Sequence, residues 1–187
     1  MLDRLDSFDR SLTLFINGWH SDWADPFMIF MSEKWVWFPF YALLVFFLFR
    51  TFPLKAFSIR LMGLVIGVAF SDQTASTLLK PNVLRLRPCH NINLQPLLHL
   101  PHGCGGTYGF ASSHAANAFF LAFFFFFLFR KTNPWMSFLL VWATLVAWSR
   151  IYLGAHYLGD VFAGMVIGLF WAYFILKLIN HRKLILS

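Results

Sequence analysis

Two side chains in the last third of this 187-residue chain have the spacing of a nucleophilic catalytic pair. His156 and Asp160 are four positions apart, so in a helix they lie on the same face. A carboxylate there can accept the Nδ1 proton of the imidazole and leave Nε2 free as a nucleophile. A second histidine, His114, is more often structural when taken alone, but together with this pair it indicates a catalytic role.

Basic and hydroxyl side chains stand at the ends of several apolar stretches. Lys80 and Arg87 are seven positions apart, two turns along one helical face if the segment between them is helical, and Arg150 ends a later stretch. Ser112 and Ser113 begin another stretch, and the unpaired N–H groups of a helix N-terminus attract anions. Three cations and a helix start predict a receptor for a tetrahedral dianion such as phosphate. The alternative is that the cations only anchor helices to lipid headgroups.

In order and spacing these residues resemble the three-part signature of the type 2 phosphatidic acid phosphatase superfamily. The matching segments are Lys80-x6-Arg87-Pro88, Ser112-Ser113-His114 and Ser149-Arg150-x5-His156-x3-Asp160. The resemblance covers positions 80–160, and the surrounding apolar stretches are similar to the membrane branch of that superfamily. The family's second motif usually reads Pro-Ser-Gly-His, whereas this chain has Ala-Ser-Ser-His. A serine at position 113 keeps the N–H donor and adds a hydroxyl, but it lacks the conformational freedom of glycine.

The resemblance implies a role for each matching residue. His156 would attack phosphorus and form a phosphohistidine, and Asp160 would hold and polarise its ring. His114 would protonate the leaving oxygen and then deprotonate the incoming water. The phosphate would be bound by the side chains of Lys80, Arg87 and Arg150 and by the main-chain N–H groups of Ser112 and Ser113. The resemblance implies no metal ion and no other cofactor.

The composition is that of an integral membrane protein. The chain is 59% hydrophobic and 12% charged, whereas soluble domains are roughly 25% charged. Disorder, collagen and coiled coil are thereby excluded, and two cysteines are too few for a disulfide-rich miniprotein. The net charge of +7 does not indicate a nucleic-acid partner, because no basic run is interleaved with aromatic residues on a soluble domain. Its partners are instead expected to be the lipid bilayer and a lipid phosphate.

The apolar stretches predict an all-α bundle of five transmembrane helices in a single domain, 1–187. A helix needs about 20 residues to cross the hydrocarbon, or 17 at the short end. The five candidate spans are 35–49, 61–79, 111–129, 134–148 and 157–179. Residues 1–34 differ, because their apolar and acidic residues alternate with helical spacing between 2 and 31. We expect an amphipathic helix on the membrane interface, with a sixth span as the alternative.

Basic residues predict how the helices are oriented. Eight of them, and no acidic residue, fall on the same side of a five-span chain: Arg50, Lys55, Arg60, Arg130, Lys131, Lys177, Arg182 and Lys183. The positive-inside rule makes that side cytoplasmic. We therefore expect a protein of the bacterial inner membrane with a cytoplasmic C-terminus, and with the 80–110 loop and the site facing the periplasm.

The 80–110 loop also contains both cysteines of the chain, Cys89 and Cys104. In an oxidising compartment they could form a disulfide, which would stabilise the fold by roughly 3 kcal/mol in the chain-entropy model. The alternative interpretations of the two cysteines are a zinc site and a pair of free thiols. The zinc site would use neighbouring histidines: His90, His99 and His102.

Four other features have competing interpretations. Asp72 must face the bundle, where it would pair with a site cation or satisfy buried hydroxyls and Gln73. Arg85 is expected to reach the headgroup region rather than a second phosphate. The phenylalanine run 119–127 circles its helix, so most of it should face lipid or neighbouring helices rather than contact a substrate. Tyr108 and Phe110, next to the site, are the candidates for an apolar substrate entrance.

Together these features predict a metal-independent phosphatase acting on a membrane lipid at the outer leaflet. By family analogy undecaprenyl diphosphate is the first expectation for the substrate. A lipid A phosphatase comes next, followed by a phosphatase of phosphatidylglycerophosphate or phosphatidate. Two alternatives are not enzymes: an anion or lipid transporter without hydrolysis, and an inactive lipid-binding protein. The oligomeric state is not predicted.

Overall fold

Helices make up most of the chain that the computed structural model describes, residues 2–185, with side chains from 4 to 181. Two residues used in the orientation argument, Arg182 and Lys183, have side chains outside that part. The α-helices are α1 (Leu2–Asn17), α2 (Ala24–Ser32), α3 (Phe38–Thr51), α4 (Leu54–Gln73), α5 (Lys80–Val83), α6 (Ser113–Phe129), α7 (Phe138–Tyr152) and α8 (Leu158–Ile185). Shorter turns link them: η1 (Trp35–Trp37), the π-helical η2 (Thr74–Leu79), η3 (Pro88–His90), η4 (Gln95–Leu97) and η5 (Pro134–Ser137).

The predicted membrane bundle is confirmed. Three helical stretches are long and apolar enough to span a membrane: Leu54–Val83, Pro134–Tyr152 and Leu158–His181. The pair Ala24–Ser32 and Trp35–Thr51, bent by 75°, forms a fourth if it is counted as one broken span, and Ser113–Phe129 is a shorter apolar helix. The five stretches predicted from the sequence thus fall on α3, α4 with η2, α6, α7 and α8.

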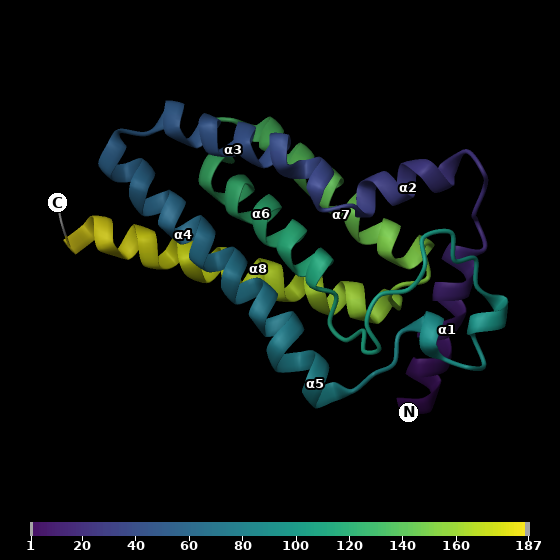
Figure 1. Cartoon of the computed structure of the whole chain (residues 1–187). Coiled ribbons are helices and arrows are strands. Elements are labelled where there is room, and N and C mark those ends of the chain that lie inside the picture. The colour runs from purple at the N-terminus through teal and green to yellow at the C-terminus, as the bar shows by residue number, and fades with distance from the viewer. Residues whose placement is uncertain (1, 186–187) are drawn as a thin grey trace.

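Helix α6 lies in the middle of the bundle, in contact with α4, α7 and α8 (Figure 1). Its Phe120, Phe124 and Phe125 are fully buried, and Phe129 is 1% exposed. These rings therefore pack against neighbouring helices rather than lipid. The prediction that most of the run faces lipid or neighbouring helices therefore agrees with the structure for these rings, and the central position of α6 explains why they face helices.

Close packing of α6 on α8 depends on two glycines four residues apart. A Cβ at Gly164 would lie 2.5 Å from the Ser112 carbonyl oxygen, and one at Gly168 would lie 2.5 Å from the Ala116 oxygen. Small residues at this spacing let two membrane helices approach until their backbones touch. The contact places the start of α6 against the first turns of α8, where the Ser112 N–H donates to the Asp160 carbonyl at 3.0 Å.

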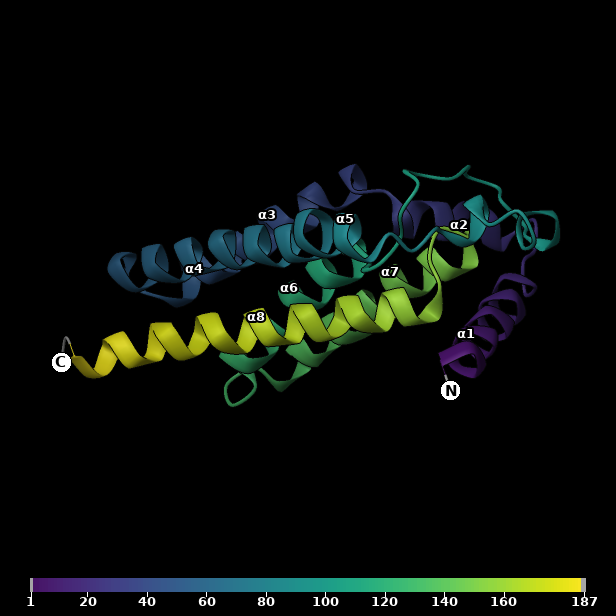
Figure 2. The ribbon, with the colours of Figure 1, turned by 90° about the horizontal axis from the view of Figure 1, so that it is seen from below.

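The predicted amphipathic segment 2–31 is two helices rather than one, because the chain turns between Asn17 and Ala24. Helix α1 has its apolar side outward, with Phe8 and Phe15 about 60% exposed, whereas Thr13 is buried. An apolar outer face is the arrangement expected of a helix on the membrane interface. Helix α1 contacts α7 and α8 at the end of the bundle that holds the long loop (Figure 2).

The two ends of the bundle contain different elements. The 84–112 loop, the α7–α8 turn and α1 lie at one end, and the α3–α4 turn, the α6–α7 turn and the C-terminus lie at the other (Figure 1). The residues that resemble a phosphatase signature belong to the first end. The basic residues used to predict the cytoplasmic side belong to the second.

Candidate functional site

Arg87 reaches the site through a reversal of the chain, not along a helix. Helix α5 ends at Val83 because Leu84 takes a left-handed conformation with φ 53°. The prediction that Lys80 and Arg87 share one helical face is therefore wrong. Beyond the reversal the Arg87 N–H donates to the Thr107 carbonyl at 3.1 Å, and this pairing fixes the backbone of the arginine beside the α7–α8 turn.

His156 lies in the α7–α8 turn and is 1% exposed. Its Nδ1 is 3.4 Å from Oδ2 of Asp160, and its Nε2 is 3.2 Å from Nη1 of Arg87. A guanidinium can only donate, so Nε2 must be the nitrogen without a proton, and Nδ1 donates toward Asp160. The lone pair of Nε2 therefore points at one of the predicted phosphate-binding cations.

The charge state of His156 suits a nucleophile. Burial lowers the pKa of the imidazole well below its ordinary range, and neighbouring positive charges lower this pKa further. Those charges belong to Arg87, Arg150 and Lys80. The ring is consequently neutral at pH 7, and the three predicted cations surround it.

Asp160 is completely buried in the first turn of α8. Its Oδ2 accepts the Tyr157 N–H at 3.1 Å, and its Oδ1 accepts from Nη1 of Arg85 at 2.8 Å. A Cβ at Gly109 would lie 2.8 Å from Oδ2, so the 84–112 loop can cover this carboxylate only with a glycine there. The carboxylate beside His156 is thus held from three directions.

Arg85 is the main residue that sequence reasoning misjudged, since it binds carboxylates rather than lipid headgroups. Besides Asp160 it donates to Asp9 at 2.8 Å and to Asp6 at 3.2 Å, both from α1. Its guanidinium also lies 4.0 Å from the ring centroid of Tyr157. Asp6 and Asp9 are about 80 positions away in the sequence, and no local pattern links them to Arg85.

Helix α1 also caps the first turn of α8. The Gly159 N–H donates to Oδ1 of Asp9 at 2.8 Å, and the Leu158 N–H donates to Oγ1 of Thr13 at 3.2 Å. The first N–H groups of a helix have no hydrogen-bond acceptor within that helix. Asp9 and Thr13 of α1 supply acceptors for two of these groups in α8. The N-terminal segment is therefore part of the frame that holds Asp160.

The two serines predicted to bind phosphate stand at the start of α6. Ser112 is buried and is the N-cap, with its side chain 3.4 Å from the Ala115 N–H that donates to it. Its own N–H donates to the Asp160 carbonyl, so the expected phosphate contact of that N–H does not agree with the structure. Ser113 is the first helical residue, and it is not among the residues with positive φ. Its hydroxyl lies 3.3 Å from Nζ of Lys80, which donates to it. Serine therefore fits the place where the family usually has glycine, and it adds a contact to a site cation.

Arg150 and His114 line the same small cavity, of about 300 Å³, together with Ala155 next to His156. Arg150 donates to the hydroxyl of Ser32 at the end of α2. Residues from α2, α6, α7 and the long loop thus meet at one hollow. All the residues predicted to act on a phosphate lie at this end of the bundle.

Asp72 does not form an ion pair within the described part of the chain. Its carboxylate accepts from Nδ2 of Asn117 at 2.9 Å and from the Ser76 hydroxyl at 3.2 Å. The second of the two predicted roles, satisfying buried polar groups, therefore agrees with the structure, although Gln73 bonds instead to Thr77.

An apolar cavity of about 470 Å³ adjoins His114 between α3, α4, α6 and α7. Aromatic side chains such as Trp35, Phe38 and Tyr41 line much of it. Tyr108 and Phe110, which were expected at an apolar entrance, are not among the lining residues. This cavity lies on the α3 side, where η1, which follows α2, contributes Trp35 and Trp37 to its lining.

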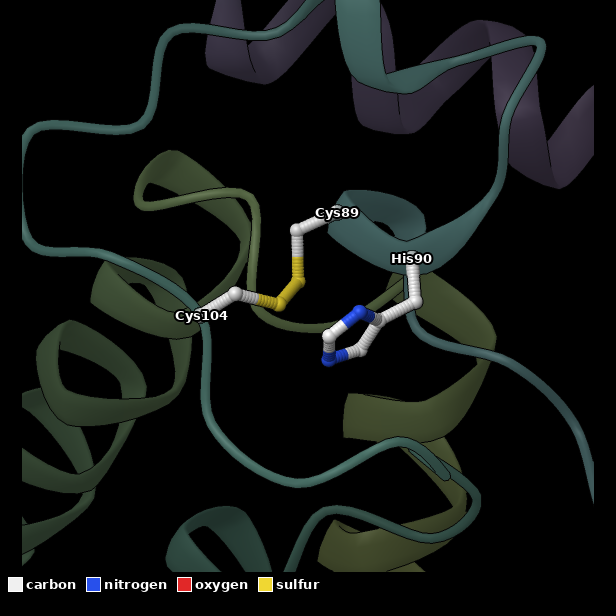
Figure 3. A group of neighbouring side chains, drawn as sticks. All are labelled: Cys89, His90 and Cys104. Carbon is white, nitrogen blue, oxygen red and sulfur yellow. A yellow bond between two sulfur atoms is a disulfide. The ribbon is translucent and has the colours of Figure 1, made fainter.

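Cys89 and Cys104 are joined by a disulfide, with their Cα atoms 6.1 Å apart (Figure 3). His90 is close to both sulfurs, but sulfurs bonded to each other offer no thiolate to a metal ion. The other two histidines of the zinc hypothesis are engaged elsewhere, His99 with Asp25 at 2.7 Å and His102 with Glu33 at 2.8 Å. The structure thus contains the disulfide and not the zinc site.

Comparisons with known proteins give a family and two named relatives. The family model described as PAP2 superfamily matches residues 56–184. A lipid A 4′-phosphatase of Bacteroides thetaiotaomicron is 39% identical over 179 residues, which cover 93% of this chain and 79% of the relative. A lipid A 4′-phosphatase of Porphyromonas gingivalis is 34% identical over 179 residues, covering 94% of this chain and 74% of the relative.

Two crystal structures are similar in fold. A PAP2-type phosphatidylglycerolphosphate phosphatase from Bacillus subtilis has a TM-score of 0.71 at 20% identity, covering 95% of this chain and 87% of that one. Aquifex aeolicus LpxE has a TM-score of 0.64 at 24% identity, covering 89% and 93%. At these identities the likeness concerns the fold alone.

The contacts of Arg85 predict a stability effect. Arg85→Ala leaves the buried Asp160 carboxylate without its cation. We expect a loss of about 2–3 kcal/mol in the free energy of unfolding, less than the roughly 3–5 for a fully buried pair, because the Arg85 side chain is 22% exposed. Asp160→Asn should restore most of this loss in the Arg85→Ala background, because it removes the charge that needs a partner.

The measurement is denaturant unfolding in detergent, with Arg10→Ala as the matched control. Arg10 also pairs with Asp6, but both side chains are about 40% exposed, so its loss should cost at most about 1 kcal/mol. Equal effects of the two arginine substitutions would contradict a special role of Arg85.

Proposed function

Since this chain belongs to the PAP2 superfamily and hydrolyses a lipid phosphate, we propose that its substrate is lipid A and that it removes the 4′-phosphate. The support is that two relatives over most of the chain are lipid A 4′-phosphatases by name. The order expected from the sequence, with undecaprenyl diphosphate before lipid A, is reversed on this ground. Undecaprenyl diphosphate and phosphatidylglycerophosphate are the competing substrates.

The observation that supports a lipid substrate best is the junction of two cavities at His114. The cavity of about 300 Å³ contains Arg150 and adjoins the His156 turn, and the apolar cavity of about 470 Å³ runs between the membrane helices. Lys34 and Trp35 line both. A substrate with a phosphate at one end and an acyl chain at the other would fill the two cavities together, with its phosphoester bond beside His114.

In the proposed first step the Nε2 lone pair of His156 attacks phosphorus. The nitrogen–phosphorus bond forms as the bond from phosphorus to the lipid oxygen breaks, and His114 gives that oxygen a proton. Asp160 stabilises the positive charge that the imidazole gains. Arg87, which donates to Nε2 in the free protein, would instead donate to a phosphate oxygen, and Lys80 would add a second cation.

In the second step water attacks the phosphohistidine. His114, now without its proton, takes a proton from the water, the bond between phosphorus and Nε2 breaks, and inorganic phosphate leaves. His156 returns to its neutral form with the proton on Nδ1. The N–H group of Ser113, at the start of α6, would help to stabilise the phosphate oxygens in both steps, whereas that of Ser112 is already donated to the Asp160 carbonyl.

The protein is an integral membrane protein, and we propose that its site faces the periplasm. The separation of the basic helix ends from the site end supports this orientation, as does the disulfide, which requires an oxidising compartment. Ile92→Cys, in the long loop, should react with a membrane-impermeant maleimide in spheroplasts of an inner-membrane expression host, whereas Lys131→Cys should not. Labelling of Lys131→Cys alone would contradict the orientation.

The substrate and the roles of the histidines can be tested in one assay. Purified protein should release inorganic phosphate faster from lipid A bearing a 4′-phosphate than from undecaprenyl diphosphate or phosphatidylglycerophosphate. His156→Ala should lower kcat at least about 10³-fold by removing the nucleophile, and His114→Ala about 10²–10⁴-fold by removing the proton donor.

His181→Ala is the control, because this histidine is exposed at the opposite end of the bundle from the proposed reaction. It should retain most of the activity. Faster release from undecaprenyl diphosphate would overturn the proposed substrate alone. Undiminished release by His156→Ala would overturn the proposed mechanism.

A further inference from the structure

A larger cavity lies at the opposite end of the bundle from His156, and catalysis does not use it. Its volume is about 620 Å³, within the range of small-molecule sites. The ends of α4, α6 and α8 contribute to it. Its basic and amide lining residues are five: Arg60, Arg130, Lys177, Asn180 and His181. Phe52 also lines it.

No carboxylate side chain of this protein can neutralise these cations. After position 34 the sequence contains two acidic residues, Asp72 and Asp160. Asp160 is paired with Arg85 at the other end, and Asp72 follows Arg60 by twelve positions on the same helical stretch, about 18 Å along its axis. The earlier acidic residues belong to α1, α2 and the adjoining turns at the site end (Figure 1).

The lack of a neighbouring carboxylate matters most at Arg60, because this residue is only 2% exposed. Its Nη1 donates to the Ala56 carbonyl at 2.9 Å, and its guanidinium lies 4.0 Å from the ring centroid of Phe52. Its Nε has no hydrogen-bond partner among the described residues. A buried guanidinium has five donors and a full charge, so burial without an anion is costly. The described residues do not provide that anion.

The rest of the lining indicates which anion would fit. Phe127, Leu176 and Tyr173 add apolar surface beside the cations. A small inorganic ion would leave this surface without a partner, whereas a phospholipid offers both a phosphate and acyl chains. Basic pockets between the ends of membrane helices bind such headgroups.

We propose that this cavity binds the phosphate headgroup of an anionic membrane phospholipid, with Arg60 as its buried partner and Lys177 at its exposed rim. The lipid would connect the ends of α4, α6 and α8, whose opposite ends approach Lys80, His114 and Asp160. This site is separate from the catalytic one, and the inference does not depend on the proposed substrate.

The test is thermal unfolding in detergent with added phosphatidylglycerol, phosphatidylcholine of the same acyl chains, or inorganic phosphate. Phosphatidylglycerol at saturating concentration should raise the Tm of the wild-type protein by at least about 4 °C. Arg87→Gln should keep this shift, which separates the cavity from the catalytic site. Arg50→Gln is the matched control, because Arg50 is an exposed arginine at the same end that does not line the cavity, and it should keep the shift too.

Arg60→Gln should lose most of the shift. An undiminished shift in this variant, or an equal shift with phosphatidylcholine or inorganic phosphate, would overturn the proposal. Because loss of a buried arginine can also impair folding, the exposed Lys177→Gln gives a second test. Native mass spectrometry should then show phosphatidylglycerol bound about fivefold more weakly than to the wild-type protein. Unchanged binding would contradict the site.

Discussion

The site depends on the orientation of one imidazole between a carboxylate and a guanidinium. Asp160 takes the proton side of His156, and Arg87 lies against the side with the lone pair. This arrangement fixes the tautomer of the imidazole, because the carboxylate can only accept a hydrogen bond and the guanidinium can only donate one. Burial, together with three positive charges near the ring, lowers the pKa of the imidazole and keeps it neutral, which is the form that can attack phosphorus.

A series of ion pairs links the position of Asp160 to the N-terminal helix α1. Asp160 is buried and charged, so it needs Arg85, and Arg85 in turn binds Asp6 and Asp9 on α1. Helix α1 meanwhile presents its apolar side outward, where an interfacial helix would meet the membrane. Attachment of α1 to the membrane and the position of the proposed nucleophile are therefore linked by a few direct contacts.

The sequence predicted the spans and the grouping of site residues because both depend on local patterns, apolar length and motif spacing. It could not predict the partners of Arg85, which lie about 80 positions away. The reversal at Leu84 was also missed, because leucine rarely adopts positive φ and carries no turn signal. The burial of the α6 phenylalanines, such as Phe124, depends on which helix is central, and that is a property of the whole bundle.

The central claim is that Nε2 of His156 becomes bonded to phosphorus during turnover. The most direct measurement is rapid quenching of the reaction with lipid labelled by ³²P, followed by digestion and mapping of the labelled peptide. We expect a phosphoenzyme that is stable in base and labile in acid, located at His156 and absent from His156→Ala. Turnover of the wild-type protein without any phosphoenzyme, or with the label on another residue, would contradict it.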